Sequence, residues 1–297
     1  MHRALVHDTA MRGTALNKGF AVLPDGRVLI ATTRAELFVL DPRGYSVTEV
    51  TPIGRQITAG PPSAFTDVIA GPDGRAYVGT NNGHTYAASL LPGAAAPWVD
   101  LGIPSPGDGY VTDLAIHAGV LYAGTALTRG GLFAWPLAGG AWQALPLPGV
   151  PAGGSGSVTQ VAVVGAHLYA SYDGTAAGTD GTYVYDLAAG RWSNVEPGAL
   201  WVVTAGPNPA DEIVYARGAA ERLSTYDPRS ARPGVPDVHP VGTLAWPGGQ
   251  MPSGPGWIDP TTLLTSAGPA PIGATRVTTP PGCRASRSFA VTSPPAS

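Results

Sequence analysis

The sequence has one cysteine, one lysine and no long apolar run. Cys283 alone cannot form an internal disulfide, so the fold must be held together by its own core. No apolar run approaches the ~18 residues that a membrane span needs, so we expect no membrane partner. Charged residues make up only 12% of the chain, the net charge is −3 and no basic cluster is present, which argues against nucleic acid as a partner.

The first residues, Met1–Asp8, lack the apolar core of a secretory signal, and no Asn-x-Ser/Thr acceptor site occurs. With the single cysteine, this predicts a cytoplasmic protein, although a secreted chain whose signal had been removed would look the same. All basic side chains except Lys18 are arginines, as is typical of a GC-rich bacterial genome. The sequence does not determine the oligomeric state, and a monomer is compatible with it.

One unit recurs along the whole chain. In its clearest copy, residues 65–86, a short buried run is followed by a Pro-Asp-Gly-Arg turn at 72–75, a second strand and a third strand. The 41 glycines and 31 prolines indicate many turns and few helices. A hairpin of this size buries too little surface to persist alone, so the unit must pack against its own copies.

The second strands of this unit recur at intervals of 45 to 49 residues, which is close to the blade period of propeller proteins. They fall at residues 28–32, 76–80, 121–125, 168–172, 213–217 and 262–266. Six repeats predict an all-β fold: a six-bladed β-propeller of four-stranded antiparallel blades, forming a single domain over residues 1–297.

The predicted blades cover most of the chain, at residues 16–54, 64–104, 110–148, 157–198, 199–247 and 253–292. The innermost strands are expected at residues 16–22, 65–70, 111–116, 158–163, 200–204 and 255–259. Residues 1–9 should complete the last blade, because closure of the ring by strands from both termini removes exposed sheet edges. The tail, residues 293–297, is expected to be flexible. Three tryptophans at equivalent outer positions should pack between blades: Trp98, Trp142 and Trp192.

Two kinds of motif resemble known propeller families. The Pro-Asp-Gly-Arg turns at 24–27 and 72–75 are similar to those of six-bladed propellers of the gluconolactonase and strictosidine-synthase-like group, and residues 133–142 and 183–192 resemble kelch repeats. The first resemblance implies a divalent metal in the channel, held by a glutamate on the first inner strand and by further Asn and Asp ligands. The first inner strand of this chain contains no glutamate.

Matching polar pairs begin three successive inner strands: Thr66-Asp67, Thr112-Asp113 and Thr159-Gln160. The starts of inner strands open on the face formed by the loops between blades, where propeller ligands usually sit. The two carboxylates could act as general acid and base, or could hold a hard cation such as Ca²⁺ together with Asp259. The hydroxyls and the amide would then contact the substrate. Alternatively, these side chains could hydrogen-bond backbone N–H groups and have a structural role alone.

Three more residues belong to the predicted site. Lys18, on the first inner strand, could take part in catalysis, balance the carboxylates, bind an anionic ligand, or be a solvated side chain. Trp201 and Trp257 fall on inner strands and either line an apolar pocket or fill the core. Apart from the candidate cation, the sequence indicates no cofactor.

Two classes of function remain. The first is an enzyme of hydrolase, lyase or cyclase type, acting on a small molecule at the channel mouth by acid–base or metal-assisted chemistry, with a place in biosynthesis. The second is a non-catalytic propeller that binds a carbohydrate or a protein. No nucleophile-elbow, metalloprotease or phosphate-loop motif points to another reaction. Aromatic ligand sites repeated on every blade would indicate a lectin, and their absence from the sequence favours the first class.

Overall fold

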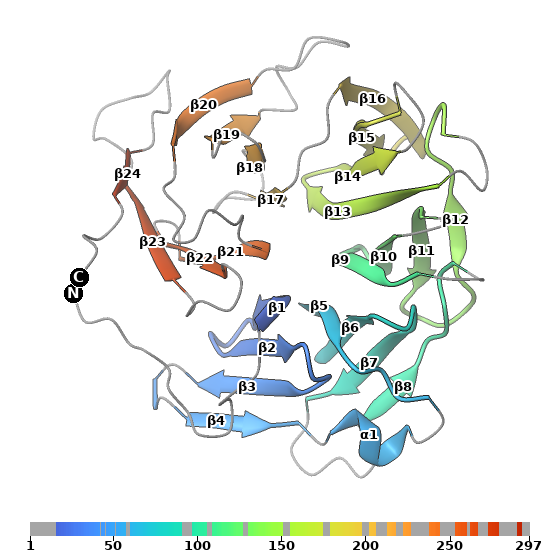
Figure 1. Cartoon of the computed structure of the whole chain (residues 1–297), viewed down its shortest axis with the longest axis vertical. Helices are drawn as coiled ribbons and strands as arrows, with labels where there is room; N and C mark the ends of the chain where they lie inside the picture. Colours follow the sequence, from blue (N-terminus) through green and yellow to red (C-terminus); the bar gives the residue numbers. More distant parts are fainter. Residues whose placement is uncertain are drawn as a thin grey trace. The chain divides into compact units, whose positions relative to one another are not determined.

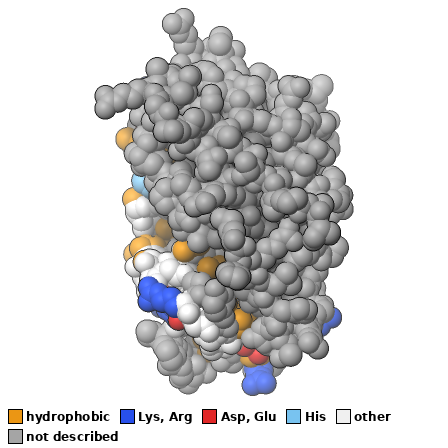
Figure 2. All heavy atoms as spheres, turned by 90° about the vertical axis from the view of Figure 1, so that its left-hand side faces the viewer, with side chains coloured by type: hydrophobic (Ala, Val, Ile, Leu, Met, Phe, Trp, Pro, Cys, Tyr) orange, Lys and Arg blue, Asp and Glu red, His pale blue; other side chains and the backbone are white. Residues whose placement is uncertain are grey.

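A computed structural model describes residues 16–41, 43–44, 46–50, 52–57, 60–90, 97–105, 109–126, 130–150, 155–174 and 179–197, followed by separate strands as far as residue 292. Side chains are described between residues 19 and 192. Within this part of the chain, no helix has the length and apolar character needed to cross a membrane. On the face drawn in Figure 2, the described basic side chains lie in separate places and form no single patch.

The chain divides into two compact units, residues 1–161 with 173–179 and residues 162–172 with 180–297. The first unit holds three four-stranded antiparallel sheets whose neighbouring strands are consecutive in sequence (Figure 1). They are β1 (Leu16–Val22), β2 (Val28–Thr32), β3 (Leu37–Asp41) and β4 (Ser46–Glu49); β5 (Phe65–Ala70), β6 (Arg75–Thr80), β7 (Thr85–Ser89) and β8 (Trp98–Asp100); and β9 (Val111–His117), β10 (Val120–Thr125), β11 (Leu132–Pro136) and β12 (Gln143–Leu145).

A fourth sheet begins with β13, which starts in the first unit, and two more sheets follow in the second unit. Their strands are β13 (Gly156–Val164), β14 (His167–Gly174), β15 (Gly181–Asp186) and β16 (Arg191–Pro197); β17 (Val202–Ala205), β18 (Ile213–Arg217), β19 (Arg222–Tyr226) and β20 (Val238–Thr243); and β21 (Ser253–Asp259), β22 (Thr262–Ser266), β23 (Gly273–Thr278) and β24 (Ala290–Thr292).

These sheets confirm the prediction of an all-β chain built from four-stranded antiparallel blades. The number of blades in the ring and its closure by both termini stay predictions. Residues 1–9, expected to complete the last blade, and the tail 293–297 lie outside the described residues. The division into two units does not test the predicted single domain, because blades contact chiefly their neighbours and share no common core.

Turn chemistry places the strand ends where the sequence predicts them. In the turn between β5 and β6, the N–H of Gly71 donates to the carbonyl of Arg75 at 2.7 Å, and Gly74 has a φ of 74° that favours glycine. The predicted bounds of the inner strands at 16–22 and 65–70 are confirmed to the residue. The same holds for the second strands at 28–32, 213–217 and 262–266.

The three equivalent tryptophans all make aromatic contacts with residues of their own sheets. Trp98 and Trp142 also belong to cores shared with a neighbouring sheet, which confirms the predicted packing between blades for these two. Trp98 is 3% exposed, and its ring centroid lies 5.5 Å from that of Phe65 in a core shared by the first two sheets. The rings of Trp142 and Trp192 lie 6.3 Å from Trp135 and 5.0 Å from Tyr185, respectively. Large aromatic rings supply much of the apolar area that such cores bury.

One short helix, α1 (Ile53–Gln56), was not predicted, because four residues are too few to show helical periodicity. Its Gln56 side chain binds the backbone of Trp98 in both directions. The amide donates to the Trp98 carbonyl at 2.5 Å, and Oε1 accepts from the Trp98 N–H at 3.0 Å. The helix therefore connects the segment after β4 to the start of β8.

Two glycines allow the next inner strand to approach closely. A Cβ at Gly79 of β6 would lie 2.6 Å from Val111 Cγ1, and a Cβ at Gly124 of β10 would lie 2.8 Å from Val158 Cγ1. Both valines are fully buried and begin the segment that carries the next polar pair. Each glycine therefore marks the point where one sheet meets the inner strand of the next.

We predict that Gly79→Ala destabilises the protein by about 2 kcal/mol, because the added methyl group meets the branched, rigid side chain of Val111. Gly54→Ala is the matched control, since a Cβ at Gly54 meets nothing within 4 Å. Urea unfolding of both variants measures the difference. Equal unfolding free energies for the two variants would contradict this account of the close approach.

Candidate functional site

The Thr-Asp pairs predicted from the sequence lie on inner strands of two neighbouring sheets. Thr66 and Asp67 are on β5, and Thr112 and Asp113 are on β9. The carboxyl residues are buried, at 6% exposure for Asp67 and 8% for Asp113. Gln160 of β13 is also buried, at 3%. The polar side chains that the sequence placed together are therefore largely removed from solvent.

The side chains of the two pairs hydrogen-bond the backbone of the next inner strand in the same way. The Thr66 hydroxyl donates to the Val111 carbonyl, and the Thr112 hydroxyl donates to the Val158 carbonyl. Oδ2 of Asp67 accepts the Leu114 N–H at 2.8 Å. Oδ2 of Asp113 accepts the Val161 N–H at 2.6 Å. We call these four bonds, made by Thr66, Asp67, Thr112 and Asp113, the Thr–Asp ladder.

The ladder satisfies backbone groups that the sheets leave open. β9 is the edge strand of its sheet and pairs there only with β10, as β13 pairs only with β14 in its own sheet. An edge strand carries N–H and C=O groups with no partner in the sheet, and leaving them buried and unpaired is costly. If the pairs have a structural role, it is to hydrogen-bond backbone groups of the next inner strand rather than of a loop.

Asp67 and Asp113 are close enough to influence each other's protonation. Burial raises the pKa of Asp67 well above its ordinary value, and the charge of Asp113 and its hydrogen bond to Asp67 raise that pKa further. The hydrogen bonds from Val68 and Leu114 N–H groups act in the opposite direction and are weaker. Two carboxyls in one buried place cannot both ionise easily, so burial and the neighbouring Asp113 favour the protonated form of Asp67.

The chemistry available to this pair is the storage and transfer of a proton. Among the described residues, no three His, Cys, Asp or Glu side chains are grouped as metal ligands. The third proposed ligand, Asp259, lies on β21, and the structure does not describe the side chains of that strand. The side chains of three other predicted site residues are likewise not described: Lys18, Trp201 and Trp257. Thr159 is half-buried beside Gln160 on β13.

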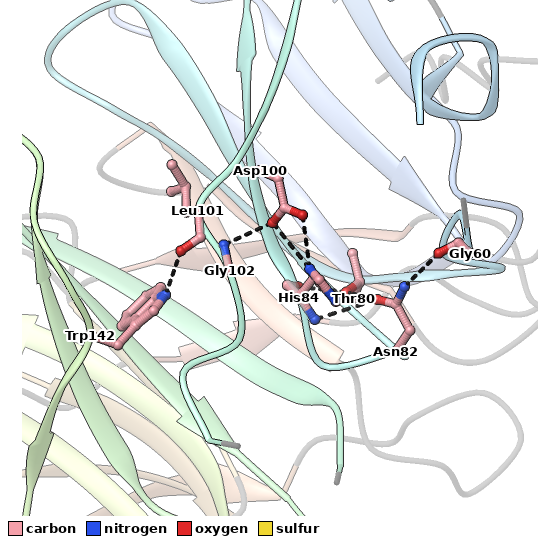
Figure 3. Close-up of polar contacts among 8 residues, drawn as sticks. All are labelled: Gly60, Thr80, Asn82, His84, Asp100, Leu101, Gly102 and Trp142. Carbon is pink, nitrogen blue, oxygen red and sulfur yellow. Dashed lines mark hydrogen bonds and ion pairs between the residues drawn. The ribbon is translucent and has the colours of Figure 1, made fainter. Parts of the chain in front are cut away.

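A second polar group, which the sequence did not indicate, lies where β6, β7 and β8 end or begin (Figure 3). Nδ1 of His84 lies 3.0 Å from Oδ2 and 3.1 Å from Oδ1 of Asp100. The side chains are partly exposed, at 29% for His84 and 40% for Asp100. We call these two residues the His84–Asp100 pair. An imidazole held by a carboxylate through one nitrogen is the arrangement of many general bases.

Backbone contacts hold both members of this pair in place. Oδ1 of Asp100 also accepts the Gly102 N–H at 2.8 Å. The backbone of the next residue, Leu101, is fixed on two sides. Its N–H donates to the Thr85 carbonyl at 2.9 Å, and its carbonyl accepts from Nε1 of Trp142 at 3.0 Å (Figure 3). The His84 ring lies parallel to the ring of Tyr86, with centroids 5.7 Å apart and planes 13° apart.

The sequence contains both residues of this pair, but it does not predict that they lie side by side. Asp100 is brought to His84 because β7 and β8 pair with Tyr86 opposite Asp100. The connection between these strands includes residues 91–96, which lie outside the described residues. A connection of that length does not specify a register, so the pairing could not be derived from turn chemistry.

No family model and no curated protein matches this chain. Solved structures do match. The hydrazine synthase of Kuenenia stuttgartiensis is 14% identical with a TM-score of 0.62, over 88% of this chain and 76% of that chain. The extracellular domain of a one-component system from B. thetaiotaomicron is 11% identical with a TM-score of 0.58, over 86% of this chain and 32% of that chain. A chain of a nidogen–laminin complex is 12% identical with a TM-score of 0.53, over 72% of this chain and 75% of that chain.

At these identities the likeness shows the fold alone, and that fold is a β-propeller. None of the three neighbours is named a gluconolactonase or a strictosidine synthase. The resemblance drawn from the Pro-Asp-Gly-Arg turns is therefore confirmed for the propeller fold and no further.

The raised pKa of Asp67 makes stability depend on pH. Above about pH 4 an unfolded aspartate loses its proton, whereas Asp67 with its raised pKa keeps its proton to higher pH, so folding takes up a proton there and stability is lost as pH rises through the folded pKa. Asp67→Asn keeps an oxygen for the Leu114 N–H but cannot titrate. We predict that its unfolding free energy, measured by urea titration from pH 4 to 8, falls less with pH than that of the wild type.

The matched variant Asp67→Ala separates titration from hydrogen bonding. It leaves the buried Leu114 N–H without its acceptor, at a cost of about 1–3 kcal/mol at every pH. If wild type and Asp67→Asn show the same dependence on pH, the pKa of Asp67 is not raised in the folded protein.

Proposed function

We propose that this chain is a β-propeller enzyme that acts on a small organic molecule by acid–base chemistry, with Asp67 and Asp113 as the catalytic carboxyls. The observation that carries the proposal is the meeting of these two buried carboxyls from neighbouring inner strands, where Asp113 raises the pKa of Asp67. The protonated member can donate to a leaving group while the ionised member accepts a proton from water or from a C–H group. Hydrolysis, elimination and cyclisation can all use such a pair.

The other residues indicated by the sequence take supporting roles in this proposal. Gln160, in the position that matches Asp113 on the next strand, would orient the substrate, together with Thr159. Lys18 would balance the negative charge of the pair, and Trp201 and Trp257 would line the apolar part of a pocket. One structural neighbour bears the name of an enzyme, hydrazine synthase, which is compatible with catalysis on this fold.

A divalent cation is the alternative means of neutralising the pair. Ca²⁺ would take oxygen ligands from Asp67 and Asp113, with Asp259 as the third carboxylate. In that case the metal would polarise the substrate and the carboxylates would act as its ligands rather than as acid and base.

The second candidate function is a non-catalytic propeller that binds a carbohydrate or a protein. The Thr–Asp ladder favours it, because each carboxylate already accepts a backbone N–H from the next inner strand. Under this alternative the polar pairs stabilise the inner strands, and ligands contact other groups on the loops.

Turnover of a panel of chromogenic esters, lactones and glycosides tests the choice. We expect Asp113→Asn to lower kcat/KM on any substrate of the wild type by about 100-fold or more, because the acid–base pair is broken. Thr112→Val is the matched control: it removes the neighbouring ladder bond to the Val158 carbonyl and costs about 1 kcal/mol, but leaves both carboxyls. Equal losses of activity in the two variants would contradict the acid–base role of Asp113.

Infrared spectroscopy gives a readout that needs no substrate. A carboxyl that keeps its proton at neutral pH shows a C=O stretching band, which should vanish in Asp67→Asn. Melting temperatures measured with Ca²⁺, Mg²⁺, Mn²⁺ and Zn²⁺ test the metal: a rise that Asp67→Asn/Asp113→Asn loses would favour the cation. Absence of the band, of a metal effect and of turnover would leave the binding function.

A further inference from the structure

The imidazole of His84 is held from one side and open on the other. Nδ1 lies against the carboxylate of Asp100, and the ring face lies on Tyr86, which is 1% exposed. On the far side of the ring, Nε2 has no hydrogen-bond partner among the residues that the structure describes. Because a carboxylate only accepts hydrogen bonds, neutral His84 carries its proton on Nδ1 and presents the lone pair of Nε2 outward.

Exposed apolar side chains gather on the same stretch of chain. In the described part, the large hydrophobic residues that are exposed are Val99 at 45%, Ile103 at 40% and Tyr110 at 37%. All three lie within twelve residues of one another, around Asp100. Ile103 is also close to the other member of the pair: its Cγ2 would lie 3.7 Å from a Cβ at Gly83, the residue before His84.

The segment between these groups is fixed before any ligand arrives. The Thr85 N–H donates to the Gly102 carbonyl at 3.0 Å, which ties the residue after His84 to the residue before Ile103. Nδ2 of Asn82 donates to the Gly60 carbonyl at 3.2 Å, and the Thr80 hydroxyl donates to the His84 carbonyl at 2.5 Å (Figure 3). A preorganised polar group beside apolar surface is the usual composition of a small-molecule site.

We propose that the His84–Asp100 pair and Ile103 form a binding site for a small organic molecule with an apolar body and a hydroxyl group, whose O–H donates to Nε2 of His84. The apolar body covers Ile103, and the hydroxyl is oriented by the fixed imidazole. This site does not depend on the protonation of Asp67 and Asp113, so either proposal can fail without the other.

The role of Asp100 in this site is to position His84. Its carboxylate keeps the Nδ1 proton in place, so that Nε2 remains an acceptor. In Asp100→Asn, the side-chain NH₂ can donate to Nδ1 instead, which moves the imidazole proton to Nε2 and turns the acceptor into a donor. A hydroxyl donor then loses its partner even though the shape of the site is unchanged.

The test follows the ¹⁵N resonance of His84 Nε2 in the full chain while phenol, cyclohexanol, glucose or toluene is added. We expect saturable shifts with phenol and cyclohexanol, and none with glucose, which lacks an apolar body, or with toluene, which lacks a hydroxyl. Asp100→Asn should raise the Kd of phenol about tenfold and show the changed tautomer in its ¹⁵N shifts. Ile103→Ala, a change at an exposed position that leaves the fold intact, should raise that Kd about fivefold.

His167→Gln is the matched control. His167 is half-buried and lies beside an aromatic ring, Tyr169, at 6.3 Å, and opposite Asp186 in the β14–β15 register. Its substitution should leave the phenol-induced shift of the His84 resonance unchanged. The proposal is overturned if neither phenol nor cyclohexanol shifts His84 saturably, or if toluene shifts it as strongly as phenol does.

Discussion

The open edge of each inner strand is the constraint on which the first unit depends. β9 and β13 have a partner in their sheets on one side only, so their remaining backbone groups need donors and acceptors from elsewhere. The Thr–Asp ladder provides them from the preceding sheet, one hydroxyl and one carboxylate for each strand. Gly79 and Gly124 make this possible, because any side chain there would hold the next inner strand away.

The composition of the inner positions follows from the cost of burying charge. Asp113 already raises the pKa of the buried Asp67. A carboxylate at position 160 would add a third acidic group on the next inner strand, β13. The chain has Gln160 there, a side chain that offers both donors and an acceptor without a charge. A buried amide costs little when it is hydrogen-bonded, whereas a further ionised group would need a counter-charge.

The sequence was sufficient for the strands and insufficient for their contacts. Turns such as Gly71–Arg75 and buried runs such as Val28–Thr32 depend on neighbouring residues, so they could be predicted almost to the residue. The ladder joins residues 45 to 48 positions apart, and its partners are backbone groups that no residue type reveals. Placing Thr66-Asp67 and Thr112-Asp113 at matching strand starts was therefore possible, but choosing between a catalytic and a structural role was not.

The His84–Asp100 pair was missed for a related reason. Its members are only 16 residues apart, yet they meet because of the register of β7 with β8, which a long connection leaves unspecified. The short helix α1 escaped prediction for the opposite reason, being too brief to carry a pattern. In both cases the decisive information is a tertiary contact: Tyr86 opposite Asp100 in the first, and Gln56 bound to Trp98 in the second.

The two polar groups use their carboxylates for different purposes. In the ladder, Asp67 and Asp113 replace missing partners of the sheet, so removing either one exposes a buried backbone group and the fold itself loses free energy. Asp100 instead orients a partly exposed side chain, on a segment that the backbone bonds between Thr85 and residues 101–102 also fix. Substitution there changes what His84 can bind while leaving the sheets intact. A protein can vary the second kind of group without loss of stability, and this is why ligand recognition on rigid scaffolds so often resides in their loops.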